Sequence, residues 1–288
     1  MSQFNIIKIS DKEYPELLKK IYDPPEELYI KGDPSSLNGK CIAIVGTRKA
    51  TDYGKRIARE LAKGLAQNGF TIVSGLAEGI DTEAHLGALE AGGKTVAVFG
   101  CGIDIVFPSS NSRLADEIEK HGALISEYGP GISGAKWTFP KRNRIISGLS
   151  LGVVMVEGHY ESGAMITAKL ALDEGREVFA VPGNVEIEQT KGSHWLIKQG
   201  AKLIENVDDI LEEFDMERVG ESKPKENRDC QLSIEEMKII AGLTKEPKHI
   251  DEISIQSGIP AHEALGTLSM LEIKGQIKQL PGKYFIIY

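Results

Sequence analysis

The strongest constraint on the fold is a short apolar run that a glycine ends and an amphipathic segment follows. Residues 41–45 read Cys-Ile-Ala-Ile-Val, as expected for a central parallel strand that is covered on both faces. Gly46 ends this run, and residues 53–68 then place apolar side chains at helical spacing. A strand, a glycine turn and a helix open the nucleotide-binding α/β folds, in which the helix N-terminus faces the turn and attracts anions. Arg48 adds a cation at this turn, so we predict that the turn binds phosphate.

The alternation of apolar strand and amphipathic helix continues to about residue 214. Further apolar runs end in loops that contain glycine, and these runs occupy residues 70–73, 95–99, 123–125, 151–156 and 178–181. This order predicts right-handed crossovers and an α/β fold, an extended Rossmann-like, doubly wound, mostly parallel sheet with helices on both faces. Ligands of such sheets bind beyond the carboxyl ends of the strands, which is where the glycine-rich loops fall.

Changes in composition divide the chain into four parts. The linker contains Pro224 and lacks periodic apolar residues, while the segment after it has the pattern of three helices and a hairpin. We predict a short helical preface at 1–40 that packs on the main domain and includes a brief edge strand at 28–30, a Rossmann-like domain at 41–214, a linker at 215–230 and a winged helix-turn-helix domain at 231–288.

The composition limits the class of protein. A net charge of −8 argues against a surface coated in positive charge, but nucleic-acid binding requires only a local basic groove. No apolar run approaches the ~20 residues of a membrane span, and the N-terminus lacks a signal-peptide pattern. The three cysteines are too widely spaced to suggest a disulfide framework or a zinc site. We therefore expect a cytoplasmic protein.

Common phosphate-binding motifs and catalytic arrangements are missing from the sequence. The dinucleotide fingerprint requires three spaced glycines and an acid after the second strand, but here that strand ends in Ser74-Gly75. Residues 88–95 resemble a P-loop, yet a helix precedes them and a strand follows, which reverses the required order. The histidines have no metal-ligand spacing, and we find no triad or carboxylate pair. We predict no cofactor, no metal and no catalysis.

The main domain concentrates its cations at residues 136–144. A solvated helix start would explain such a run, but basic residues at a helix N-terminus oppose the helix dipole, and a bound anion would offset that cost. The run also follows a strand, on the same rim as Arg48. Trp137 and Phe139 are either base-stacking platforms or core residues, and cations beside such platforms hold unpaired strands without sequence choice. The predicted contacts are Lys141, Arg142, Asn143 and Arg144.

The C-terminal domain is a poor candidate for reading duplex DNA. Its third helix, at about 260–271, contains no Arg and carries Glu263, whereas major-groove readers usually rely on Arg, Lys, Asn or Gln. We expect this domain to dock a protein or to have a regulatory role instead.

Several motifs together resemble the DNA-processing protein A family, also called Smf. The match runs in order from about residue 14 to residue 214, and the appended winged helix is similar to that of many members. The preface is shorter than the helical N-terminal domain of longer members. The matching motifs are Ile-Val-Gly-Thr-Arg (44–48), Ser-Gly-Leu-Ala-Glu-Gly-Ile-Asp (74–81) with His85, Phe-Pro-Lys-Arg-Asn-Arg-Ile-Ile-Ser-Gly (139–148), Glu-Ser-Gly-Ala-Met-Ile-Thr (161–167), Val-Pro-Gly-Asn (181–184) and Gly-Ser (192–193).

The resemblance implies a protein that binds single-stranded DNA and forms a homodimer. Members of the family load a RecA-type recombinase onto incoming strands in natural transformation, displacing or bypassing single-strand-binding protein. On this interpretation the chain is a non-enzymatic recombination mediator of competence. Carried over by motif, its DNA-binding residues are Gly46, Thr47 and Arg48 in the first turn, Lys141, Arg142, Asn143 and Arg144 in the second patch, and Ser162, Gly163 and Asn184.

Two other functions stay open at this point. The related nucleotide phosphoribohydrolases have a similar sheet, but their double-glycine loop with its following glutamate is absent from residues 161–167. Release of free base from nucleoside monophosphates would support that enzyme class. A winged-helix transcription regulator would instead protect one duplex sequence, and deleting residues 231–288 would abolish that footprint.

Overall fold

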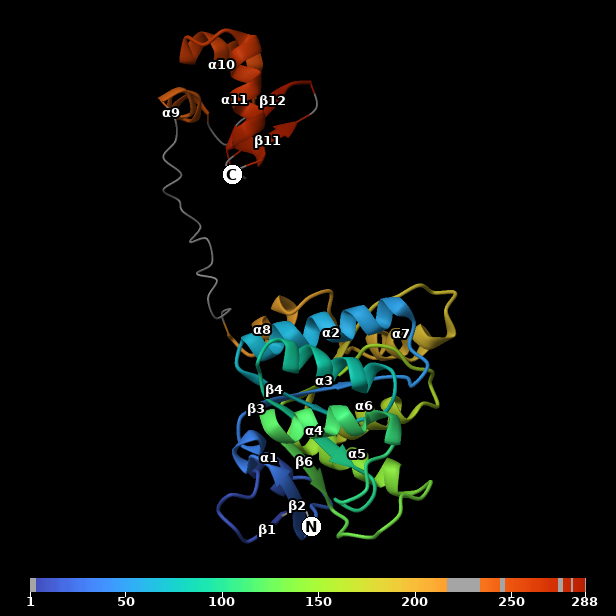
Figure 1. Cartoon of the computed structure of the whole chain (residues 1–288). Helices are drawn as coiled ribbons and strands as arrows, with labels where there is room; N and C mark the ends of the chain where they lie inside the picture. Colours follow the sequence, from blue (N-terminus) through green and yellow to red (C-terminus); the bar gives the residue numbers. More distant parts are fainter. Residues whose placement is uncertain (1–3, 217–233, 244–246, 274–276, 281, 288) are drawn as a thin grey trace. The chain divides into compact units, whose positions relative to one another are not determined.

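The computed structural model describes residues 4–216, 234–243, 247–273, 277–280 and 282–287. The chain divides into two compact units, Met1–Glu221 and Ser222–Tyr288 (Figure 1). Each unit has its own hydrophobic core. The predicted linker at 215–230 lies outside the described residues from position 217 onward.

The first unit is built on one nine-stranded sheet in the order β1-β2-β6-β5-β4-β3-β7-β8-β9. Neighbours from β6 to β9 in this order run parallel, whereas β1 pairs with β2, and β2 with β6, in antiparallel fashion. The predicted doubly wound, mostly parallel sheet is confirmed. Its strands are β1 (Asn5–Lys8), β2 (Glu27–Gly32), β3 (Lys40–Val45), β4 (Phe70–Ser74), β5 (Thr95–Phe99), β6 (Ala123–Ser126), β7 (Gly152–Met155), β8 (Glu177–Ala180) and β9 (Lys202–Leu203).

Helices cover both faces of this sheet. They are α1 (Glu16–Lys19), α2 (Asp52–Gln67), α3 (Ile80–Glu90), α4 (Ser112–His121), α5 (Thr138–Leu149), α6 (Gly163–Asp173), α7 (Lys191–Lys198) and α8 (Asp208–Glu213), with 3-10 turns at Pro34–Leu37, Ser109–Asn111 and Glu188–Thr190. Helices α2 and α3 pack side by side (Figure 1). Ile42 and Ile44 of β3 pack in the layer of α2, α3 and α8, whereas Ala43 and Val45 pack in the layer of α1, α5, α6 and α7. Burial on both faces explains why the β3 sequence is an unbroken apolar run.

The N-terminal segment contributes more to the sheet than the sequence predicted. The strand expected at 28–30 lies inside the sheet, between β1 and β6, so its prediction as an edge strand is wrong. The edge is formed by β1, which was not predicted, because only Ile7 of its four residues is buried and no alternating pattern results. Tyr14 anchors the segment, since its buried hydroxyl donates to the Pro25 carbonyl at 2.7 Å.

In its described residues, the second unit combines three helices with a three-stranded antiparallel sheet in the order β10-β12-β11. The winged helix predicted from the sequence is confirmed, although the two-residue strand β10 is too short to leave a pattern. Its described elements are α9 (Ile234–Gly242), β10 (Lys248–His249), α10 (Ile250–Ser257), α11 (Ala261–Ile273), β11 (Ile277–Leu280) and β12 (Tyr284–Ile287). Among the described residues of both units, no helix combines the length and apolar character that a membrane span requires.

Candidate nucleic-acid interface

The order of strands reverses beside β3, and a groove opens at that point. The chain first places β4, β5 and β6 on one side of β3, and later places β7, β8 and β9 on the other. The loops that leave β3 and β7 therefore diverge at the carboxyl ends of the two strands, where such folds bind their ligands. The groove there has a volume of about 600 Å³, and its walls include these loops, α5 and the first turn of α6.

The groove brings together most of the residues predicted to bind DNA. It is lined by Gly46, Thr47, Arg48, Arg142, Asn143, Ser162 and Gly163. Lys141, Arg144 and Asn184 do not line it. Asn184 is exposed in the loop after β8, where its side-chain oxygen accepts the Glu186 amide at 2.9 Å.

The turn after β3 has a tightly held backbone and a free cation. A Cβ atom on Gly46 would overlap the Ile80 side chain and the Glu157 carbonyl, so this close approach requires glycine. Thr47 donates its amide to the same carbonyl at 2.7 Å. Arg48 is exposed at the groove and forms no ion pair with any described residue.

The N-terminus of α2 does not offer the anion site that the sequence predicted. The buried Glu157 carboxylate lies there, and it accepts the Thr51 amide at 2.9 Å and the Thr51 hydroxyl at 2.5 Å. Thr51 in turn caps the helix, accepting the Gly54 amide at 3.1 Å. An internal carboxylate thus lies at the end of α2, where an external anion would otherwise bind. Local sequence patterns could not reveal this, because Glu157 is 106 positions from Thr51.

Arg142 lines the groove from a buried position and is not part of an exposed patch. Only 6% of this residue is exposed, and its Nη1 donates to the carbonyl oxygens of Gly75, at 3.0 Å, and Val98. Its Nε donates to the Asn143 side-chain oxygen at 3.2 Å, while its Nη2 donates to no acceptor among the described residues. Burial lowers the pKa of this guanidinium, and the Asp81 carboxylate opposes the shift. Because an arginine stays protonated in proteins, Arg142 is a fixed cation, and the two N–H groups of its Nη2 are free to donate.

Asn143 and Asp81 hold the walls of the groove in place. Asn143 donates its amide group to the Gly163 carbonyl at 3.0 Å and so joins α5 to the start of α6. Asp81 accepts the Gly75 amide at 3.1 Å, which shapes the loop after β4. Burial raises the pKa of the Asp81 carboxyl group, and the charge of Arg142 is the largest influence against that rise. Both side chains line the groove, but their hydrogen bonds are made within the protein.

The predicted basic patch at 141–144 is not a group of free cations. Arg144 is buried, and it bonds Asp23 at 3.0 Å and Glu127. Lys141 is half-exposed and lies 3.3 Å from the same Glu127 oxygen. Successive residues of a helix point in different directions, so a compact run in the sequence is dispersed around α5.

The first turn of α6 presents backbone donors to the groove. Ser162 is the N-cap, and its hydroxyl accepts the Met165 amide at 3.3 Å. The amides of Gly163 and Ala164 have no acceptor within the helix, as the geometry of a first turn requires. Both residues line the groove, so the positive end of α6 faces it.

The groove is electropositive although the whole chain carries a net charge of −8. Against the single carboxylate of Asp81, its lining has four basic side chains, those of Arg48, Lys49, Lys136 and Arg142. Phe107 and Phe139 add an apolar wall, with ring centroids 5.4 Å apart. Lys49 and Phe107 were not predicted as site residues from the sequence. Lys49 adjoins Arg48, and Phe107 lies in an irregular connection without a pattern.

Comparisons of the sequence point to one family. The family described as DNA recombination-mediator protein A matches residues 5–215, and the DprA winged helix domain matches residues 223–283. The chain belongs to the DprA/Smf family. DNA processing protein DprA of Bacillus subtilis is 48% identical over 221 residues, which cover 76% of this chain and 74% of that protein. Protein Smf of Escherichia coli is 38% identical over 288 residues, which cover 97% and 76% of the two chains.

Solved structures of DprA proteins share the fold of this DprA-family chain. The X-ray structure of Streptococcus pneumoniae DprA matches with a TM-score of 0.71 and 44% identity, covering 73% of this chain and 74% of that one. A Helicobacter pylori structure, described by its unique single-stranded DNA binding mode, matches with a TM-score of 0.67 and 31% identity, covering 75% and 99%. The resemblance inferred from the motifs is confirmed.

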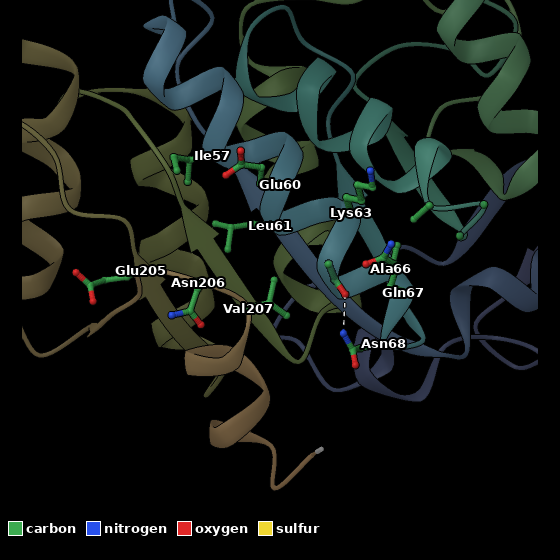
Figure 2. A pocket seen from close by; sticks show the side chains of 14 residues that line it. Ile57, Glu60, Leu61, Lys63, Ala66, Gln67, Asn68, Glu205, Asn206 and Val207 are labelled. Atoms are coloured by element: carbon green, nitrogen blue, oxygen red, sulfur yellow. Dashed lines mark hydrogen bonds between the residues drawn. The ribbon is translucent and has the colours of Figure 1, made fainter. Parts of the chain in front are cut away.

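A larger hollow in this DprA-family protein is less suited to phosphate. It has a volume of about 820 Å³ and lies beside the C-terminal half of α2, between residues 91–93 and 205–207 (Figure 2). Glu60, Lys63 and Glu205 are its charged side chains (Figure 2). The C-terminal ends of α2 and α3 also lie here, and helix C-termini carry partial negative charge. Volume alone therefore does not identify the hollow that suits phosphate.

Proposed function

We propose that this protein binds single-stranded DNA in the groove beside β3 and acts as a non-enzymatic recombination mediator. The observation that carries the proposal is the excess of cations in a groove at the switch point of a chain that is acidic overall. Phosphates would neutralise those cations and release counterions, which makes binding sensitive to salt. The described binding mode of the Helicobacter pylori relative supports the same ligand class.

The lining of the groove provides three kinds of phosphate contact. Arg48 is exposed, has no ion-pair partner in the described part of the chain, and can follow the strand as it enters. Arg142 is held rigidly and has the two N–H groups of Nη2 left to donate, so it loses little conformational freedom on binding. The free amides at the start of α6 add donors that carry no net charge.

Selectivity for the single strand follows from the apolar wall of the groove. Unpaired bases can turn toward Phe107 and Phe139, whereas the bases of a duplex are stacked inside the helix. The remaining predicted residues have supporting roles in this proposal. Asn143 joins two walls, Lys141 lies outside the groove, and Arg144 holds the N-terminal segment.

The proposed cellular role rests on the family resemblance. We infer that the protein loads a RecA-type recombinase onto incoming strands in natural transformation, in the cytoplasm, and that it meets single-strand-binding protein there. We further infer a homodimer. Exposed apolar side chains on α6 and β9, those of Ile166, Leu172 and Leu203, are of the kind that a second copy covers. Sedimentation velocity over a range of concentrations tests the dimer.

The binding proposal is tested by fluorescence anisotropy with a labelled oligothymidylate and with a duplex of equal length, over a series of salt concentrations. The single strand should bind more tightly, and Arg48→Ala should lower the slope of log K against log salt by about 1. Arg56→Ala is the matched control, because Arg56 is exposed on α2 and paired with Glu60. Equal affinity for both DNAs, or an unchanged slope in Arg48→Ala, would overturn the proposal.

A further inference from the structure

We propose that Trp137 is a stacking platform for an unpaired base at the place where the DNA strand leaves the groove. The proposal rests on the function proposed above and adds a contact outside the groove. It assigns the bound group by its chemistry, a nucleobase of single-stranded DNA.

Trp137 lies on the surface, although burial of a tryptophan side chain usually stabilises the folded protein. It is 63% exposed and directly precedes α5. Its nearest aromatic neighbour is Tyr128, whose ring lies at 82° with the centroids 6.4 Å apart. A perpendicular neighbour can cover only one face of the indole ring, so an open face remains for a stacking partner.

The backbone at Trp137 is held on both sides. The Thr138 amide donates to the Ala135 carbonyl at 3.0 Å, and the buried Thr138 hydroxyl bonds both the amide and the carbonyl of Ala135. On the other side, the Trp137 carbonyl accepts the Lys141 amide at 3.3 Å in the first turn of α5. A ring on a fixed backbone pays less conformational entropy when a base stacks on it.

Trp137 continues the groove along the chain, and cations flank it. Ala135 and Lys136 line the groove, and Trp137 is the next residue. Lys141 follows one helical turn later and is half-exposed. Its partner Glu127 is also bonded by Arg144, so that carboxylate is shared between two cations. Alternating cations and an aromatic face are the arrangement that holds an unpaired strand, which favours DNA over a protein as the occupant.

The first test uses the intrinsic fluorescence of Trp137. The chain has two tryptophans, and the other, Trp195, is partly buried beneath Lys169, so Trp195→Phe leaves Trp137 as the only source of tryptophan emission. Saturating oligothymidylate should quench this emission. An oligomer of the same length with abasic sugars should bind through its phosphates and quench much less. Anisotropy on the same samples reports whether DNA is bound at all.

The second test is substitution. Trp137→Ala should weaken binding of oligothymidylate about tenfold without changing the salt slope, because stacking releases no counterions. Trp137→Phe should retain most of the affinity. Tyr22→Ala is the matched control, since Tyr22 is fully exposed and does not line the groove. Its affinity should equal that of the wild type, and equal melting temperatures would show that all variants are folded.

The two proposals fail in different ways. Binding by anisotropy without any change in the Trp137 emission would overturn the stacking platform and leave the groove intact. A Trp137→Ala affinity equal to that of the wild type would do the same. No binding of the oligomer would overturn the proposed function itself.

Discussion

The turn after β3 and the start of α5 both bring basic residues to the groove, but their cations are held in opposite ways. Arg48 is exposed and has no described ion-pair partner, whereas Arg142 and Arg144 are buried and hydrogen-bonded. An exposed cation stays hydrated until a ligand arrives, while a buried guanidinium has lost its water and must be compensated by the protein. We therefore propose that Arg48 serves binding, Arg144 serves folding and Arg142 serves both.

The largest expected effect comes from Arg142→Met, which should lower the free energy of unfolding by ~3–5 kcal/mol. Asp81 would stay buried without its nearby cation, and its pKa, which burial already raises, would rise further. A carboxyl group whose pKa is raised in the folded state lowers the free energy of unfolding most at high pH. The difference in this free energy between Arg142→Met and the wild type should therefore shrink as the pH falls. Urea denaturation between pH 8 and pH 5 measures this. A loss of the same size at every pH would contradict the compensation of Asp81 by Arg142.

Arg144→Ala should lower the free energy of unfolding by about 2 kcal/mol, which is less than the effect of Arg142→Met. The effect is smaller because Glu127 still has Lys141 nearby and Asp23 is exposed to water. The melting temperature should fall, while the salt slope for oligothymidylate measured well below that temperature should not change. A reduced salt slope would show that Arg144 contacts phosphate after all, and would remove the contrast with Arg48.

The imidazole of His85 reports on the buried charge at Arg142. The Thr95 hydroxyl donates to the Ile72 carbonyl at 2.8 Å and lies 2.7 Å from His85 Nδ1, so Nδ1 carries the proton. Its Nε2 is buried without a partner among the described residues. Burial, and then the charge of Arg142, lower the pKa of His85 from 6.5 to about 3.

Because the folded pKa of His85 lies below the unfolded value, its contribution to stability is present above pH 6.5 and is lost as the pH falls toward 3. Between pH 7 and pH 5 the free energy of unfolding should fall by about 2 kcal/mol, because it falls by ~1.4 kcal/mol for each pH unit below 6.5. In His85→Gln the stability curve from urea denaturation should be flatter over this range. If the free energy of unfolding of His85→Gln varied with pH as steeply as that of the wild type, other groups would be the cause of the pH dependence.

The smallest effect on stability is expected for Arg48→Ala, within ~0.5 kcal/mol, because an exposed side chain without an ion pair is removed. Its affinity for oligothymidylate should nevertheless fall severalfold at low salt, and less at high salt. Calorimetric melting and anisotropy measure the two quantities. A marked fall in melting temperature would show that Arg48 supports the fold, as the arginines of α5 do.

Much of the architecture was predictable, because strands and helices leave local patterns. The apolar run of β3 and the alternation that follows it indicated a parallel sheet, and the turn at Gly46 indicated the rim on which the groove opens. The strand β1 was missed because only Ile7 of its residues is buried. Periodicity reports burial, so an edge strand with few buried residues gives no signal.

The sequence by itself determined the fold class, the family and the rim on which the basic residues lie. Only the tertiary structure decided which of those cations are free. Arg144 is paired with Asp23 and Glu127, and Glu157 occupies the end of α2 that seemed open to phosphate. Each of these partners comes from a distant part of the chain. The physical reason is that secondary structure follows from neighbours in sequence, whereas the desolvation and pairing of a charge depend on neighbours in space.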